Sequence, residues 1–196
     1  MPEEFVRLRR VSDNLQTSLE KLFATPEPPE LGPGPRPGVR PQSELDAELK
    51  TIFRQTQLAE GSRELIRSLV LLWHDHLDTS HTISQGIENA DGSLLHAIMH
   101  RREPDYWNSK YWWRRVGQHP CFGELGKRVT AFLASSGEQE LGSKLVPRGT
   151  WDGGAFVDAC EAAAGQAASG RVQILREVQR VELEVALAHF LRDEAR

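Results

Sequence analysis

Seven of the eleven prolines in this chain of 196 residues fall within one short segment, between Pro26 and Pro41. Proline has no backbone N–H group and a fixed φ, so the sequence ATPEPPELGPGPRPGVRPQ can form neither a helix nor a central strand. We expect an extended, semi-rigid linker over residues 24–42. Docking of this segment into an aromatic groove, as a polyproline ligand, is the alternative. The linker divides the chain into an N-terminal segment (1–23) and a main domain (43–196).

Before the linker, apolar residues recur at intervals of three and four between Phe5 and Phe23. This spacing predicts an amphipathic helix that must pack against another surface. A helix held on such a linker can fold back on its own domain or reach across to a second copy of the chain. The sequence does not choose between these, so a homodimer is a possible assembly.

The main domain shows helical periodicity and no sustained alternation typical of strands. Turn residues separate the helices, and residues 135–154 are rich in them. The sequence therefore predicts an all-α protein, a bundle of about six or seven helices preceded by the N-terminal helix. The expected helices cover residues 43–58, 63–78, 79–88 (as a continuation or a new helix), 94–102, 105–116, 121–134, 155–166 and 171–192.

Composition excludes several classes of protein. A formal net charge of −4 argues against a general nucleic-acid binder. No apolar run approaches the roughly 20 residues of a membrane span, and the charged N-terminus is not a secretory signal. The two cysteines, Cys121 and Cys160, form neither a disulfide framework nor a CxxC motif. We expect a protein of a reducing compartment, the cytoplasm, with no membrane partner.

Six of the seven histidines and four of the five tryptophans lie between Gly61 and Pro120. If the helix that begins near residue 63 stays continuous, His74, Asp78 and His81 share one face. His96 and His100 form an i, i+4 pair on the next helix, a spacing that lets two imidazoles reach one ion. A short turn joins the two helices, so antiparallel packing would bring both sets around one cavity.

Two kinds of chemistry fit this histidine cluster. His74, His81, His96 and His100 could hold a transition metal such as zinc, since nitrogen-rich ligand sets favour such ions over magnesium or calcium. Without a metal, His74 and His81 could act as catalytic general bases oriented by Asp75 and Asp78. Purely structural histidines are the third interpretation, because no HExxH or other known ligand motif is present.

Aromatic and basic residues follow the histidines directly. Trp107 and Tyr111 could wall a small-molecule site, and Arg101 and Arg102 could hold an anionic part of the ligand. His119 lies where the chain turns back, and its ring could reach the same cavity. A hydrophobic corner held by ion pairs is the alternative. Stacking on nucleic acid is disfavoured, because residues 61–120 carry seven basic and seven acidic side chains.

Two further residues carry chemistry but have no evident partner in the sequence. His189 lies in the last predicted helix, far along the chain from the cluster, and we expect it to be structural. Cys121 has no evident activating neighbour, which favours a buried thiol over a nucleophile.

The stretches WHDHLDTSHTISQ and DGSLLHAIMHRREPDYWNSKYWWRRVGQHP, both between Trp73 and Pro120, resemble a family of uncharacterised bacterial and fungal proteins. The resemblance covers about a quarter of the chain. It implies no activity, substrate or catalytic residue.

Two classes of function follow. The first is a small-molecule enzyme or ligand-binding protein, with a cleft between helices that is lined by the histidines, aspartates and arginines named above. The second is a non-catalytic scaffold that assembles through its N-terminal helix and aromatic block.

Overall fold

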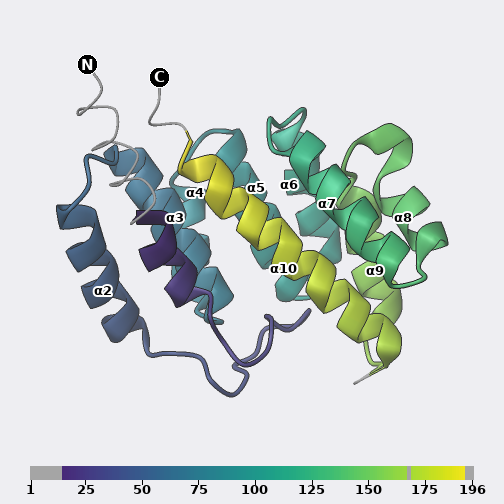
Figure 1. Cartoon of the computed structure of the whole chain (residues 1–196), viewed down its shortest axis with the longest axis horizontal. Helices are drawn as coiled ribbons and strands as arrows, with labels where there is room; N and C mark the ends of the chain where they lie inside the picture. Colours follow the sequence, from purple (N-terminus) through teal and green to yellow (C-terminus); the bar gives the residue numbers. More distant parts are fainter. Residues whose placement is uncertain (1–14, 167–168, 193–196) are drawn as a thin grey trace.

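A computed structural model describes residues 15–166 and 169–192 of the chain. These residues contain helices and no strand, which confirms the all-α class. Figure 1 shows the helices packed around one another, with the long last helix crossing the front. After a helix over residues 15–22, the elements are α2 (Gln42–Arg54), α3 (Glu60–Trp73), α4 (Leu77–Gln85), α5 (Ala90–Arg102), α6 (Tyr106–Val116), α7 (Phe122–Ser135), α8 (Gln139–Leu145), a 3₁₀ turn (Pro147–Gly149), α9 (Gly153–Ala163) and α10 (Gly170–Phe190).

The number of helices exceeds the expected six or seven for two reasons. The helix expected over residues 63–78 ends at Trp73, and α4 begins only at Leu77. Between them Asp75 has a φ of 66°, a left-handed conformation that stops a helix. In addition, α8 forms within residues 135–154, a segment whose many turn residues predicted irregular structure.

The centre of the bundle is α5, in which every side chain from Gly92 to Arg102 is buried. It packs against α3, α4 and α6. Besides the small Ser93, four of its buried residues are polar: His96, His100, Arg101 and Arg102. Burying a polar group without a hydrogen-bond partner is costly. The hydrogen-bond partners of these four side chains therefore show which of them are structural and which are left for a ligand.

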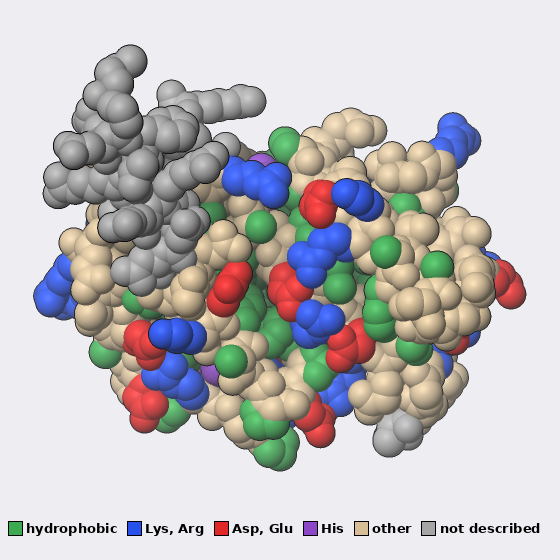
Figure 2. Space-filling model, in the orientation of Figure 1, with side chains coloured by type: hydrophobic (Ala, Val, Ile, Leu, Met, Phe, Trp, Pro, Cys, Tyr) green, Lys and Arg blue, Asp and Glu red, His purple; other side chains and the backbone are tan. Residues whose placement is uncertain are grey.

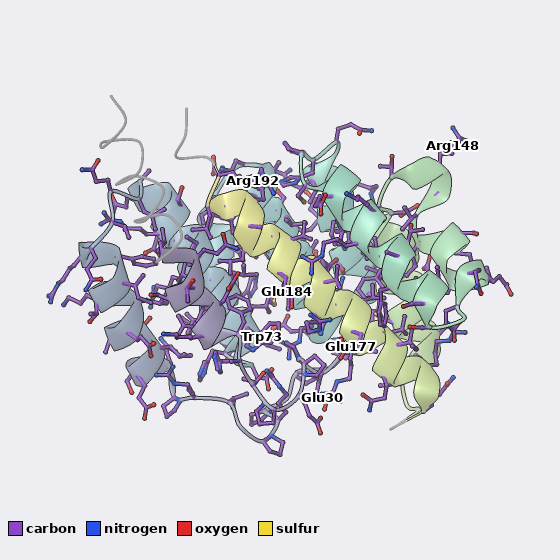
Figure 3. The ribbon with its side chains drawn as sticks, in the orientation of Figure 1. Glu30, Trp73, Arg148, Glu177, Glu184 and Arg192 are labelled. Carbon is purple, nitrogen blue, oxygen red and sulfur yellow. The ribbon has the colours of Figure 1, made fainter. Side chains whose placement is uncertain are left out.

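The proline-rich segment has no helix or strand, as its composition predicts, but it does not act as a spacer. We call residues 24–41 the strap. Its backbone carbonyls accept hydrogen bonds from buried side chains of the main domain. Gln179 of α10 donates to Pro29 O (3.0 Å) and Glu30 O (2.9 Å), and Arg102 of α5 donates to Glu30 O (3.0 Å). Figure 3 shows Glu30 of the strap close to α10, with Trp73 nearby at the end of α3.

This arrangement has a simple physical reason. An irregular segment rich in proline cannot satisfy its own carbonyl groups, so it can be buried only if other groups donate to them. Arg176 of α10 supplies another donor, to Pro28 O at 2.6 Å. The strap therefore lies on its own domain, held by residues from α5 and α10.

The break between α3 and α4 belongs to the same network. The Asp75 carboxylate lies between Arg36 of the strap and Arg102 of α5, each 2.6 Å away, and all three side chains are at most 2% exposed. His74 contacts Leu22 O (2.8 Å) and accepts from the backbone N–H of Arg40 (3.2 Å). The turn at residues 74–76 thus holds the strap at Arg36 and Arg40 and the end of the N-terminal helix at Leu22.

The N-terminal helix packs on the same chain within the part that is described. Leu15, Leu19 and Leu22 are buried in the common core. The rest of the helix that was predicted from Glu3 lies in residues 1–14, outside the described ranges. For residues 15–22, packing on its own domain is the arrangement observed.

The surface shown in Figure 2 carries basic and acidic side chains interleaved along α10. Two of the ion pairs are Arg128 with Glu184 (2.5 Å) and Arg180 with Glu177 (2.7 Å); both glutamates are labelled in Figure 3. Across residues 15–166 and 169–192, no helix has the length and apolar character needed to cross a bilayer.

Candidate metal centre

Three histidines, one from α4 and two from α5, lie close together where these helices pack. His81 of α4 faces His96 and His100 of α5, and one ring nitrogen from each lies within 4.8 Å of the others. The ring centroids are 4.6 Å apart for His81 and His96, 5.1 Å for His81 and His100, and 4.7 Å for His96 and His100. The antiparallel packing of α4 and α5 brings them together, and Asn89 fixes the start of α5 by accepting from Gly92 N (2.8 Å).

His96 is the most deeply placed of the three. It is 2% exposed and stacks on Trp112 of α6, with the ring centroids 3.9 Å apart and the planes 15° from parallel. Its Nδ1 atom is buried and has no hydrogen-bond partner among the described residues. Burial, followed by the neighbouring His100 and His81, lowers the pKa of His96 to about 3. The ring is therefore neutral at physiological pH, and neutral imidazole is the form that binds metals.

His100 is held in a defined orientation. Its Nδ1 lies 3.3 Å from Glu103 Oε2, and its Nε2 lies 3.1 Å from the side-chain nitrogen of Asn108. A carboxylate at Nδ1 favours the tautomer with its proton there, so the Nε2 lone pair accepts from the Asn108 amide N–H, and a metal at Nε2 would have to replace this hydrogen bond. Burial raises the pKa of Glu103, and the carboxylates of Asp78 and Asp105 add to this shift. The surroundings of His100 are thus acidic and suit a cation.

The geometry of the three imidazoles is close to that of a zinc site. Nitrogens bound tetrahedrally to zinc at about 2.1 Å are about 3.4 Å from one another. The observed upper limit of 4.8 Å means that the nitrogens would have to approach one another by up to about 1.4 Å. Three protein ligands leave the fourth coordination position open, as in catalytic zinc sites. We call His81, His96 and His100 the trihistidine centre.

A second group of ligand-type side chains lies elsewhere. Asp91 Oδ1 is 2.9 Å from His119 Nε2 and 3.0 Å from His189 Nε2. Burial alone would raise the pKa of Asp91, but the hydrogen bonds from both histidines hold it well below its usual range. His189 is therefore not isolated from the other histidines, as its distance along the chain suggested. His119, expected at the same cavity as the main cluster, belongs to this second group.

The hydrogen bonds of the second group oppose metal binding. The backbone N–H of Cys121 donates to His119 Nδ1 (3.3 Å), so this nitrogen carries the lone pair. The proton of the neutral ring is then on Nε2, where it is donated to Asp91. A metal at Nε2 would require the proton to move to a nitrogen that already faces a donor. The second group is thus a closed hydrogen-bond network, whereas His96 Nδ1 is left without a partner.

The remaining predicted site residues do not join the trihistidine centre. His74 and Asp75 anchor the strap, because the helix that would have aligned His74 with His81 is broken. Arg101 is fully buried and pairs with Glu182 at 2.5 Å. Burial lowers the pKa of Arg102 to about 10 despite its pairing with Asp75. Both guanidinium groups are engaged inside the protein, so neither is placed to hold an anionic ligand.

Other predicted residues lie at or near the surface. Asp78 is exposed in the first turn of α4. Trp107 and Tyr111 are exposed on α6, by 75% and 39%. Cys121 is buried, and burial raises the pKa of its thiol to about 12, which agrees with an inert thiol.

Three residues of the centre's surroundings were not singled out from the sequence: Glu103, Asn108 and Trp112. Glu103 could have been found, because it follows His100 by three residues and so lies on the same helix face. Asn108 and Trp112 depend on how α6 packs across α5, which the sequence does not reveal.

Histidine side chains appear only in small areas of the face in Figure 2, in keeping with the burial of most of them. Comparisons of the chain with protein-family models, with curated proteins and with solved structures gave no match.

Proposed function

We propose that this protein binds one divalent transition metal, zinc being the best fit, through His81, His96 and His100, and acts on a small molecule at the open coordination position. The observation that carries the proposal is the group of three imidazoles, largely buried, with one ring nitrogen of each within 4.8 Å of the others. A metal ion would hold all three rings. His96 also has a buried Nδ1 atom without a hydrogen-bond partner among the described residues, so its ring is not fixed by a hydrogen bond at that nitrogen. Stacking on Trp112 supplies the rigid support that such a ligand needs.

The chemistry follows from the ligand set. Three neutral imidazoles leave the full positive charge on a divalent ion, which lowers the pKa of a bound water and polarises a carbonyl or phosphoryl oxygen. Glu103, next to His100, orients that ring and balances part of the charge. We infer a hydrolytic or related metal-assisted reaction on a small substrate. Two buried free cysteines fit a reducing compartment such as the cytoplasm.

The proposal is tested by titrating zinc into the metal-depleted full chain by calorimetry. We expect one equivalent to bind, and His81→Ala to weaken binding at least 100-fold. His81 is the variant of choice because it is only half-buried, so its removal is tolerated better than that of His96. His76→Ala is the matched control, since His76 lies outside the centre and contacts Arg40 O.

Two results would overturn the proposal. One is the absence of stoichiometric zinc binding. The other is binding that survives His81→Ala but is lost in Asp91→Asn, which would move the metal to the second group. If zinc binds, it should also raise the rate at which the protein cleaves simple nitrophenyl esters or phosphates, and His81→Ala should remove that increase.

One observation favours the alternative of a non-catalytic assembly protein: Trp107, on α6, is 75% exposed. The strap and residues 15–22 pack on their own domain, so they are not available for assembly. The exposed aromatic residues of α6, Trp107 and Tyr111, are then the surface left for it. The measurement is the mass in solution of the wild-type chain and of Trp107→Ala. A dimer that dissociates in the variant would support assembly.

A further inference from the structure

The exposed face of α6 carries a row of three side chains at successive i, i+4 positions: Trp107, Tyr111 and Arg115. Among the described residues, Trp107 and Tyr111 are the large hydrophobic side chains that remain exposed. Large aromatic rings are costly to leave in water, so an exposed pair on one face marks a binding surface. We call these three residues the platform.

The two rings present nearly parallel faces. Their planes are 12° from parallel and their centroids are 6.4 Å apart. Aromatic rings prefer offset-stacked contacts with centroids about 4.5–7 Å apart, so a planar ligand can add to such a pair. Both side chains are exposed, which leaves ring surface open to it. The pair thus favours a flat ligand.

The charge next to the rings points to an anion. The Arg115 guanidinium lies 6.0 Å from the Tyr111 ring centre and 5.1 Å from that of Trp112. Within residues 15–166 and 169–192, Arg115 has no acidic partner. Lys110, on the same helix, is by contrast paired with Asp158 and Glu161. Arg115 is therefore a basic group beside the two rings that is available to a carboxylate or phosphate, which a guanidinium binds with two parallel hydrogen bonds.

The platform is linked to the trihistidine centre through one ring. Trp112 contacts Tyr111, with centroids 5.6 Å apart, and stacks on His96 at 3.9 Å. A ligand held on Tyr111 is therefore separated from the metal-binding histidines by a single side chain. No ion pair or other polar group has to be removed from the platform to admit it.

We propose that the platform binds a planar aromatic ring carrying a carboxylate or phosphate group, and that such compounds are the substrate class of the trihistidine centre. The second half of this statement rests on the proposed metal-dependent function. The first half stands on the exposed, nearly parallel rings and Arg115, and it holds whether or not zinc binds.

The test uses the full chain and 4-nitrophenyl phosphate as the probe, followed by calorimetry without metal. Two matched compounds accompany it: 4-nitrophenol, which has the ring alone, and inorganic phosphate, which has the anion alone. We expect the probe to bind at least tenfold more tightly than either. Trp107→Ala and Arg115→Gln should each weaken it at least tenfold, and Trp107→Phe should restore most of the loss.

Because Trp107 is exposed, its replacement should leave the thermal unfolding temperature unchanged, which separates lost binding from lost folding. Equal binding of the probe to the wild-type chain and to Trp107→Ala would overturn the platform. A single-stranded oligonucleotide that binds more tightly than the probe, or a dimer that Trp107→Ala dissociates, would also overturn it.

The link to the centre has its own readout. The probe's affinity is measured again after one equivalent of zinc, and we expect it to rise at least threefold in the wild-type chain but not in His81→Ala. If zinc binds and the affinity is unchanged, the platform is not the substrate site of the centre. If zinc does not bind at all, the proposed function fails, while the metal-free data still decide the platform.

Discussion

His96 makes a quantitative prediction about acid stability. In the folded protein its pKa is lowered from 6.5 to about 3, first by burial and then by the two neighbouring histidines. Between these values the unfolded chain binds a proton that the folded protein does not. The stability that depends on neutral His96 is therefore fully present above about pH 6.5 and is lost progressively as the pH falls toward 3.

The size of the effect follows from the two pKa values. At pH 5.0 protonation of the unfolded chain at this residue should cost the folded state about 2 kcal/mol, compared with about 0.1 kcal/mol at pH 7.5. His96→Phe keeps a flat ring between Trp112 and His100 but cannot titrate. The free energy of unfolding should fall between pH 7.5 and 5.0 by about 2 kcal/mol more in the wild-type chain than in the variant.

The measurement is urea denaturation at the two pH values, with a chelator present so that bound metal does not contribute. Other histidines titrate in both proteins, so their contribution cancels in the difference between the two slopes. An equal loss of stability in wild type and His96→Phe would refute the reasoning. It would mean that His96 is hydrated or charged in the folded protein, which would also remove the case for a neutral ligand at this position.

Three further predictions concern the strap and the thiols. Asp75→Asn leaves the two flanking guanidinium groups buried without their anion and should cost about 3–5 kcal/mol in urea denaturation, whereas Asp46→Asn, at a half-exposed ion pair, should cost less than about 1 kcal/mol. In Gly34→Ala the new Cβ would lie 2.7 Å from an Asp75 carboxylate oxygen at a φ of 81°, so thermal unfolding should show a loss of at least about 1–2 kcal/mol; Gly32→Ala, with open space around it, should change little. The Cys121 thiol, whose pKa burial raises to about 12, should not react with a maleimide at pH 8 until the chain is unfolded; rapid labelling of the native protein would contradict its burial.

The helices were predictable where one face is apolar and the ends carry turn residues. This holds for α6, α7 and α10, whose observed bounds lie within two residues of the expected ones. It fails at residues 74–76. The local sequence favours a continuous helix there, but Asp75 is needed between two arginines, one of them from the strap. A contact between distant parts of the chain overrides the local preference for a helix. The spacing of apolar residues along the sequence carries no information about such a contact.

The candidate site shows the same division. His96 and His100 were identifiable from their i, i+4 spacing, and His81 from the short turn that precedes α5. Arg101 was misplaced, because its partner Glu182 comes from α10, 81 residues further along the chain. Clusters of polar residues in a sequence thus show that polar side chains are buried together, but their partners decide which are structural and which are left for a ligand.

The strap also affects the order in which the protein can be completed during synthesis. Its carbonyl groups depend on Gln179, which follows Pro29 by 150 residues. While the ribosome is still making α7 to α9, the strap can contact Arg102, but its remaining carbonyl groups have no donor except water. The N-terminal part of the nascent chain therefore reaches its final place only when α10 emerges, so that the last helix completes the binding of the first residues made.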